Sequence, residues 1–324
     1  MIRALFSIGT NSTRLIVLDR NQRIAAESRG TRIGTGIGET GTLDPAARER
    51  TLGAIDEYVA IVRDARVSEV DAVATSALRR ASDGAAFADQ VAERVGIVPR
   101  ILSGEEEATY SFLGATASRD ADDAIAVLDV GGGSTELAID VPARARANGT
   151  VRQTTSLEIG AVRLSERHPA LLGARALAGD ERRRVEREAC ADAARVLAPL
   201  AGMRDFATLI AVGGTVFTAA AMIAGGVRDG ATMTAVDRRL LIDELLSRGL
   251  AARKAMPHIR PQRADILPAG LIVVDEACML LGVDAFTVSE ADLLLGYLTS
   301  PAFRAIPFLP RTEQQAEKRR LTES

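Results

Sequence analysis

The stretch AVLDVGGGSTELAID, residues 126–140, decides the fold class of this chain. An apolar run with one acid is followed by three glycines, a Ser-Thr pair and a second alternating run. This order predicts two strands joined by a tight glycine turn, which is a β-hairpin. Consecutive glycines let backbone N–H groups converge on an anion, and no Cβ keeps a phosphate oxygen away. The hairpin is therefore a candidate phosphate loop, with a plain glycine-rich turn as the simpler alternative.

Four polar side chains accompany these glycines, namely Asp129, Ser134, Thr135 and Glu136. The two hydroxyl groups can donate hydrogen bonds to phosphate. The two carboxylates would repel a polyanion, and their presence is better explained if a divalent cation such as Mg²⁺ lies between carboxylate and phosphate. The hairpin thus predicts a site for both phosphate and metal.

A second copy of the pattern lies near the N-terminus. The segment IGTNSTRLIV, residues 8–17, aligns with VGGGSTELAI, residues 130–139, when the chain is shifted by 122 residues. The matching pairs are Gly9 and Gly131, Ser12 and Ser134, Thr13 and Thr135, and Leu15 and Leu137. One position differs, because Ser7 stands where the second copy has Asp129. One hairpin in each half predicts a duplicated domain with a ligand cleft between the copies.

Composition limits the classes of function. A chain of 324 residues is long enough for two domains with a core in each. A hydrophobic share of 47% and a charged share of 26% are ordinary for a globular protein. The net charge of -3 gives no basic field, which argues against nucleic acid as a general partner. Any anion site must therefore be local.

The chain also lacks several sequence signals. Its two cysteines and two histidines have no metal-ligand spacing, so neither a disulfide framework nor a zinc site is expected. Its first residues show no basic region with a cleavage motif, which predicts a cytoplasmic protein. The uncharged run 209–227 is long enough to cross a membrane, but its internal glycine turn favours a strand, a turn and a buried helix. We therefore expect no membrane partner.

Two nucleotide-binding motifs are excluded. Gly36, Gly38 and Gly41 satisfy G-x-G-x-x-G, but the next helix is expected to begin only near Asp44, so the strand-turn-helix context of a dinucleotide site is missing. No G-x-x-x-x-G-K-[ST] motif is present, so a P-loop enzyme is also excluded.

The order of predicted elements favours a mixed sheet with helices in each half. Each half starts with three strands and continues with alternating helices and strands. The expected opening strands cover residues 2–8, 13–19 and 24–31, and then residues 124–130, 134–141 and 151–157. The expected parts are an N-terminal domain at 1–122, a C-terminal domain at 123–300 and a polar tail at 301–324.

The segment ILSGEEEATYSFLG, residues 101–114, places three acids at the start of a predicted helix. Ser103 is a suitable N-cap, and acids in a first turn are stabilised by the helix dipole, which is a sufficient structural explanation. Three consecutive acids nevertheless point in different directions, so one of them could act as general base on a water that attacks phosphorus. Arg79, just after a predicted strand, could neutralise phosphate charge.

Several segments together resemble one known family, the exopolyphosphatase/guanosine pentaphosphate phosphohydrolase family, in order and spacing over residues 2–300. They are SIGTNSTRLIV, TRIGTGIGETGTL, ATSALRRA, ILSGEEEA, VLDVGGGSTELAI, SLEIGAVRLSE and IAVGGT. That family belongs to the superfamily of actin, heat-shock ATPases and sugar kinases. The resemblance implies an α/β fold with two actin-like (ribonuclease H-like) domains, mixed β-sheets and an interdomain cleft, in the short form without extra C-terminal helical domains.

The resemblance also implies roles for individual residues. Glu107 matches the base that activates water, and Asp129 and Glu136 match acids associated with the metal, expected to be Mg²⁺ or another divalent cation. The residues that match phosphate-binding positions are Gly9, Thr10, Asn11, Ser12, Arg79, Gly131, Gly132, Gly133, Ser134 and Thr135. Gly213, Gly214 and Thr215 match a glycine turn that approaches the nucleotide in relatives that bind one.

Three departures from the family pattern stand out. Ser7 replaces the acid that opens the first phosphate loop and brings no negative charge to hold a cation. Thr109 stands where an arginine is common after GEEEA. Leu294 and Leu295 replace the arginine and glutamate of a G-x-L-R-E-G-like stretch.

The expected function is an exopolyphosphatase that releases terminal phosphate from inorganic polyphosphate by metal-assisted attack of water, with guanosine pentaphosphate as a further substrate. The alternative is a non-catalytic or weakly active binder of polyphosphate or nucleotide, because Ser7 replaces the acid of the first loop. The sequence leaves the oligomeric state open, a homodimer included.

Overall fold

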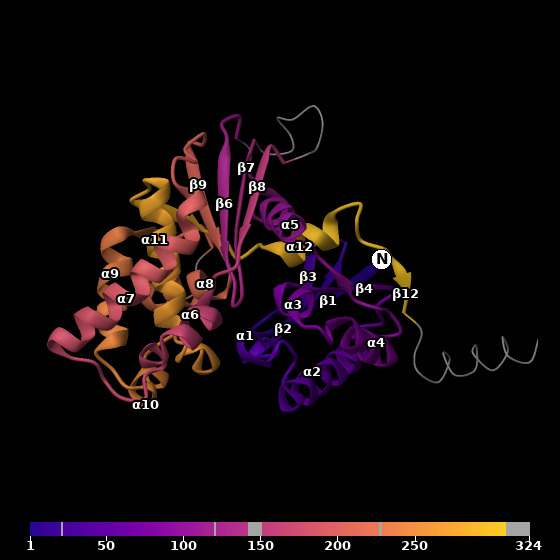
Figure 1. Cartoon of the computed structure of the whole chain (residues 1–324). Coiled ribbons are helices and arrows are strands. Elements are labelled where there is room, and N and C mark those ends of the chain that lie inside the picture. Colours follow the sequence, from indigo (N-terminus) through magenta and orange to yellow (C-terminus); the bar gives the residue numbers. More distant parts are fainter. Residues whose placement is uncertain (21, 120, 142–150, 227–228, 309–324) are drawn as a thin grey trace, which may run out of the picture. The chain divides into compact units, whose positions relative to one another are not determined.

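The structure is a computed structural model that describes residues 1–20, 22–119, 121–141, 151–226 and 229–308 (Figure 1). The chain divides into two compact units. Unit 1 comprises Met1–Leu102 and the chain from Leu298 onward, and unit 2 comprises Ser103–Tyr297. The division differs from the predicted boundary at residue 122, because helix α5 (Gly104–Thr116) packs on the sheet of unit 2.

The sheet of unit 1 is mixed, as predicted. Strands β1, β2 and β3 form an antiparallel meander, and β1 pairs in parallel with β4. The strand order is β12-β4-β1-β2-β3, with β5 beside β4. The strands are β1 (Ile2–Ile8), β2 (Thr13–Asp19), β3 (Gln22–Arg29), β4 (Glu69–Ala74), β5 (Arg100–Ile101) and β12 (Ile306–Pro307).

Helices of unit 1 cover one face of this sheet. Helix α2 begins next to Asp44, where a helix is expected. Asp44 accepts a hydrogen bond from the N–H of Ala47, and a proline occupies the first helical position. Its apolar positions face the core formed with α4 and with alternate residues of β1, β2 and β4. The helices are α1 (Ile37–Thr40), α2 (Pro45–Asp64), α3 (Ser76–Arg80) and α4 (Gly84–Val95).

The sheet of unit 2 repeats this topology. Strands β6, β7 and β8 form an antiparallel meander, β6 pairs in parallel with β9, and β9 pairs in parallel with β11. The strands are β6 (Ile125–Val130), β7 (Thr135–Asp140), β8 (Gln153–Leu157), β9 (Thr208–Val212), β10 (Thr232–Thr234) and β11 (Ala285–Val288). The repeated strand order confirms the α/β fold class with two ribonuclease H-like sheets.

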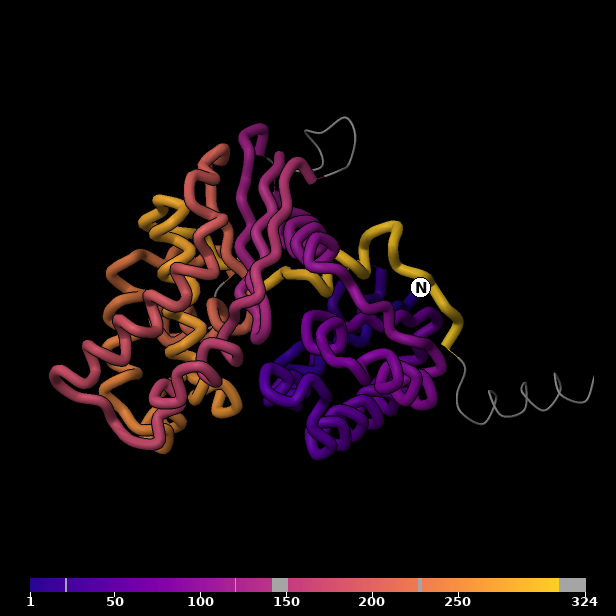
Figure 2. Tube along the Cα trace, viewed as in Figure 1, coloured from indigo at the N-terminus to yellow at the C-terminus, as the bar shows by residue number. Residues whose placement is uncertain are grey.

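Helices cover both faces of the unit 2 sheet. Successive side chains of a strand point to opposite faces, so each strand contributes to two separate cores. On one face, Ile125 and Val127 pack with Phe112 of α5. On the other face, Ala126 and Leu128 belong to a core that includes residues of α7, α8, α9 and α11. These helices lie on the side of the sheet away from α5 (Figures 1 and 2). The remaining helices of the unit are α6 (Ala161–Arg167), α7 (Gly179–Leu197), α8 (Gly214–Ala224), α9 (Ala235–Leu246), α10 (Leu250–Lys254) and α11 (Leu267–Leu281). Helix α12 (Leu293–Thr299) contains the boundary at which the chain passes from unit 2 to unit 1.

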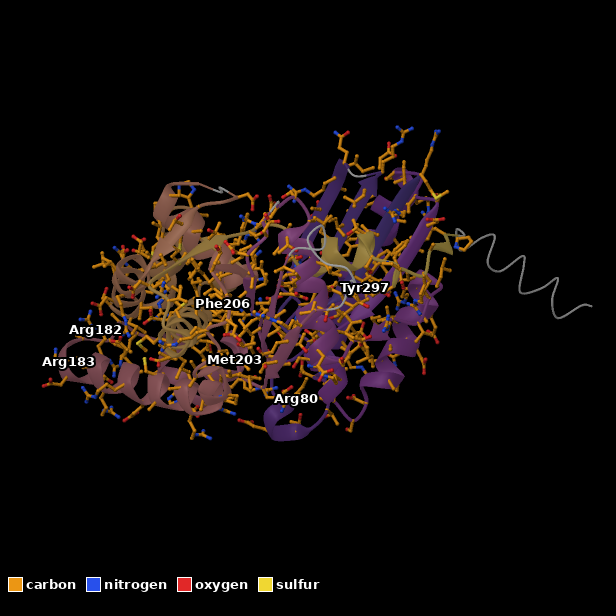
Figure 3. The ribbon with its side chains drawn as sticks, turned by 90° about the horizontal axis from the view of Figure 1, so that it is seen from above. Arg80, Arg182, Arg183, Met203, Phe206 and Tyr297 are labelled. Atoms are coloured by element: carbon orange, nitrogen blue, oxygen red, sulfur yellow. The ribbon has the colours of Figure 1, made fainter. Side chains whose placement is uncertain are left out.

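Two sequence features are explained by the helices. The charged residues at the start of α7 include Arg182 and the exposed Arg183 (Figure 3). Arg182 is paired with Asp243, and Arg183 is paired with Asp180. The uncharged run from residue 209 forms β9 and α8, as expected. Among the described residues, no helix is long and apolar enough to span a bilayer.

The end of the described chain is part of unit 1. Strand β12 pairs with β4, and Arg304 binds the buried carboxylate of Asp71 through both its backbone N–H and its guanidinium group. The predicted polar tail therefore does not begin at residue 301. Residues 309–324, which include most of that tail, lie outside the described residues.

Candidate active site

The second phosphate loop is a tight turn closed by one backbone hydrogen bond, from the N–H of Gly131 to the C=O of Ser134 at 3.0 Å. The C=O groups of Gly131 and Gly132 accept hydrogen bonds from the first amides of α6, including that of Ala161. In a trans peptide unit the C=O and the following N–H point in opposite directions. The N–H groups of Gly132 and Gly133 therefore point away from α6, as an anion-binding turn requires.

Neighbouring residues support this loop. A Cβ at Gly160 would lie 2.7 Å from the C=O oxygen of Gly131, so only glycine lets the start of α6 dock here. Thr135 is buried, and its hydroxyl donates to the C=O of Ile159 at 2.7 Å. A hydroxyl has a single hydrogen. Thr135 therefore holds the loop in place in this structure rather than donating to a phosphate.

The two acids that are expected to bind the metal, Asp129 and Glu136, lie next to each other on the sheet. Asp129 of β6 is directly opposite Glu136 of β7, and Glu136 is directly opposite Ser156 of β8. Directly paired residues share one face of a sheet. The Ser156 hydroxyl donates to Oε1 of Glu136 at 2.8 Å.

Helix α5 covers the same face and brings a third acid. Of its three consecutive acids, Glu105 is exposed, Glu106 closes a capping box with Ser103, and Glu107 is buried with 6% of its surface exposed. One acid thus enters the protein while the other two solvate and cap the helix. One turn later, Ser111 donates its hydroxyl hydrogen to Oδ2 of Asp129 at 2.6 Å.

The three acids lie within electrostatic reach of one another. The pKa of Glu136 lies well above its usual range, first because the carboxyl group is buried and then because Glu107 and Asp129 are near. Hydrogen bonds from Ser134 and Ser156 lower this pKa but do not outweigh burial. A proton or a cation would therefore relieve the concentration of negative charge.

The glycine turn at 213–215 lies beside Asp129. Gly213 has a φ of 97°, and a Cβ there would be 2.8 Å from Oδ1 of Asp129. At Gly214, a Cβ would be 2.1 Å from Cζ of Arg263, so this guanidinium group covers the turn. Sequence analysis did not identify Arg263, because a lone arginine outside any motif carries no signal until the fold brings it to a site.

The first phosphate loop has the same closing bond, from the N–H of Gly9 to the C=O of Ser12 at 3.0 Å. The C=O groups of Thr10 and Asn11 accept hydrogen bonds from the amides of Gly34 and Arg32. A Cβ at Gly34 would be 2.3 Å from Cγ2 of Thr10. The segment 32–34, just before the glycines that imitate a dinucleotide motif, thus supports the first loop.

Other predicted residues of unit 1 lie near this loop or follow a neighbouring strand. Asn11 has 4% of its surface exposed, and its Oδ1 has no hydrogen-bond partner among the described residues. Arg79 lies on α3, which follows β4, the parallel neighbour of β1. Its Nη1 donates to the C=O of Leu102 at 2.7 Å.

The three departures occupy different surroundings. Ser7 is buried in β1 and lies opposite Arg14 of β2. The alignment of the two hairpins did not identify Arg14 as a site residue. Thr109 donates its hydroxyl hydrogen to the C=O of Glu105 within α5. Leu294 is buried on α12.

A divalent cation would find two carboxylate ligands in unit 2. Within the described ranges, no group of three or more His, Cys, Asp or Glu side chains could hold a metal ion. Asp129 and Glu136 remain as a directly opposed pair. Mg²⁺ is commonly bound by one or two carboxylates together with phosphate oxygens and water. The donor set therefore fits a cation that is held jointly with a phosphate ligand.

The repeated sheet topology and the two glycine hairpins define an α/β protein of the actin-like class. Residues 16–302 match the model of the Ppx/GppA phosphatase family. The chain therefore belongs to the Ppx/GppA phosphatase family, which confirms the resemblance and makes the protein a phosphohydrolase by family.

Individual relatives agree with this assignment. The chain is 32% identical to exopolyphosphatase 2 of Mycobacterium tuberculosis over 327 residues, which cover 92% of this chain and 98% of that protein. A crystal structure of an exopolyphosphatase-like protein has 28% identity and a TM-score of 0.82, with 94% and 99% of the two chains covered. The structure of the Aquifex aeolicus PPX-GPPA enzyme has 26% identity and a TM-score of 0.72, with 92% and 98% covered.

Proposed function

We propose that this protein is a metal-dependent exopolyphosphatase that releases terminal phosphate from inorganic polyphosphate. The observation that carries the proposal is the cluster of Glu107, Asp129 and Glu136 on one face of the unit 2 sheet, beside a glycine hairpin with outward-pointing amides. The name of the M. tuberculosis relative supports polyphosphate as the substrate.

The proposed reaction is the attack of a water oxygen on the terminal phosphorus, with cleavage of the bridging P–O bond. Glu107 accepts a proton from the attacking water, and the shortened chain leaves as a phosphate anion. The amides of Gly132 and Gly133 stabilise charge on the phosphoryl oxygens. Asp129 and Glu136 would hold Mg²⁺, which supplies neutralisation of phosphate charge when bound.

The direct test compares Glu107→Gln with the parent in a phosphate-release assay with polyphosphate and Mg²⁺. Removal of a general base typically lowers the rate by about 10²–10⁴-fold. Glu105→Gln is the matched control, since Glu105 belongs to the same helical turn but is exposed. The mechanism is wrong if Glu107→Gln is as active as the parent.

Guanosine pentaphosphate is the second proposed substrate, because the family includes enzymes of that type. A side-by-side assay of phosphate release from the two substrates, with and without Mg²⁺, ranks them. Release from polyphosphate alone would remove guanosine pentaphosphate from the proposal.

A non-catalytic binder is the alternative function, and the uncharged Ser7 is the observation that favours it. The first loop would then bind phosphate without a carboxylate that directs a cation. Calorimetric binding of polyphosphate without any phosphate release would establish this alternative.

A further inference from the structure

We propose that Ser111 and Ser156 are positioning residues, which hold the carboxylates of Asp129 and Glu136 in the orientation that binds a cation and a phosphate together. The inference rests on the proposed metal-dependent function and extends it to the residues that surround the acids. Each serine donates a hydrogen bond to a different acid: Ser111 of α5 to Asp129, and Ser156 of β8 to Glu136.

Ser111 constrains Asp129 from the side of helix α5. It is 1% exposed and lies four residues after Glu107, so both side chains are on one face of the helix. Its hydroxyl donates to Oδ2 of Asp129 at 2.6 Å. Helix α5 therefore sets the orientation of this acid and the position of the proposed base at the same time.

The opposite side of Asp129 is closed by the glycine turn. A Cβ at Gly213 would be 2.8 Å from Oδ1, so the second carboxylate oxygen lies against this turn. Ser111 on Oδ2 and Gly213 beside Oδ1 leave the carboxylate little room to rotate. Its orientation is fixed before any ligand arrives.

Ser156 constrains Glu136 in a similar way, and α5 is again involved. The Ser156 hydroxyl donates to Oε1 of Glu136 at 2.8 Å. A Cβ at Gly104, the first residue of α5, would lie 2.3 Å from both Cβ and Oγ of Ser156. The helix start therefore rests on the Ser156 side chain, and only glycine permits this approach.

Such constraints matter because the three acids repel one another. Unrestrained carboxylates would separate, and they would have to be brought together again when a cation binds. Hydroxyl donors fixed in advance offset this repulsion and remove that reorganisation. Residues that orient metal ligands typically change metal affinity or activity by about 10–100-fold when they are removed.

The test measures binding of Mn²⁺, as a spectroscopic substitute for Mg²⁺, to the full-length protein by electron paramagnetic resonance in the presence of inorganic phosphate. We expect Ser111→Ala and Ser156→Ala to weaken Mn²⁺ binding by about 10–100-fold. Ser111→Thr keeps the hydroxyl and should bind as the parent does. Thr116→Val is the matched control, because Thr116 lies on the same helix, is 5% exposed and donates only to the C=O of Phe112.

Phosphate release from polyphosphate is measured on the same variants. In Ser111→Ala, the Mg²⁺ concentration for half-maximal rate should rise by about the same factor, while Thr116→Val stays at the parent value. Parent-like Mn²⁺ binding in both alanine variants, or no Mn²⁺ binding by the parent, overturns the inference. A parent that binds Mn²⁺ in a Ser111-dependent manner but releases no phosphate overturns the proposed function and supports the positioning role.

Discussion

Ser7 and Arg14 lie directly opposite each other on β1 and β2. The corresponding positions of β6 and β7 hold Asp129 and Glu136, which also lie directly opposite each other. Both loops have the same closing hydrogen bond. The two copies therefore share a backbone but differ in charge, with a serine and an arginine in unit 1 and two acids in unit 2.

Restoring the acid of the first loop should raise activity. In Ser7→Asp, the new carboxylate would lie beside Arg14, whose positive charge would offset the cost of burial. We expect phosphate release from polyphosphate to increase about tenfold, which is about 1.4 kcal/mol of transition-state stabilisation, and the Mg²⁺ requirement to fall. Ser7→Asn is the control, because asparagine has nearly the same shape as aspartate but no charge, and this variant should stay at the parent rate. Equal rates in all three proteins would exclude Ser7 as the cause of weak activity.

A methyl group at residue 160 should damage the second loop. The Cβ of Gly160→Ala would be 2.7 Å from the C=O oxygen of Gly131 and 2.7 Å from the C=O group of Gly132, and both of these groups are backbone. The first turn of α6 must then move away from the loop and change the direction of the loop amides. We expect phosphate release to fall by at least about 10²-fold, the usual cost of losing an oxyanion donor.

The control for this variant is Gly53→Ala. Gly53 is exposed in the middle of α2, and a Cβ there meets nothing within 4 Å. Alanine is a better helix former than glycine, so in urea unfolding this variant should be more stable by about 0.5–1 kcal/mol, and it should keep its activity. Full activity in Gly160→Ala would mean that the loop does not depend on α6.

The hairpins could be predicted from sequence because their signals are local. Glycines, hydroxyl residues and flanking apolar runs determine the turn, and the repeat at Gly9 and Gly131 gave the duplicated sheet. Sequence alone could not say which hydroxyl faces a ligand, and Thr135 donates inward to Ile159. The direction of a side chain at a turn depends on what packs behind it, here the segment before α6.

Contacts between distant segments explain the other omissions. Ser111 meets Asp129, Ser156 meets Glu136 and Arg263 covers Gly214 only after the sheet and helices assemble. The first and last residues of an element are also harder to predict from sequence than whether it is a helix or a strand. The strand expected at 24–31 covers Gln22–Arg29, and the strand expected at 151–157 covers Gln153–Leu157.

A buried acid far from the loops should make stability depend on pH. Burial first, and then the neighbouring Asp275, raises the pKa of Glu276 above its ordinary value of 4.5. Between the ordinary and the raised value the folded chain holds a proton that the unfolded chain has lost, so stability falls as pH rises through this range. Glu276→Gln should reduce this slope and be more stable than the parent at pH 7. Urea unfolding at pH 4.5 and 7 measures the slope, and exposed Glu188→Gln on α7 should leave it unchanged.

Arg304 should contribute more to stability than its place near the chain end suggests. Asp71 is fully buried in β4 and accepts hydrogen bonds from the backbone N–H and the Nε of Arg304, at 2.9 and 2.8 Å. Arg304→Met removes the guanidinium group and leaves a buried carboxylate without its cation. Breaking a buried ion pair from one side typically costs about 3–5 kcal/mol, and we expect a loss of that size in urea unfolding.

Two further variants separate the ion pair from general effects of losing an arginine. Arg183→Met removes an exposed partner of Asp180 and should change stability by less than about 0.5 kcal/mol, as is usual for surface pairs. Adding Asp71→Asn to Arg304→Met removes the stranded charge, so the double variant should be more stable than Arg304→Met alone. If Arg304→Met loses no more stability than Arg183→Met, the pairing of Arg304 with Asp71 does not hold the chain end against β4.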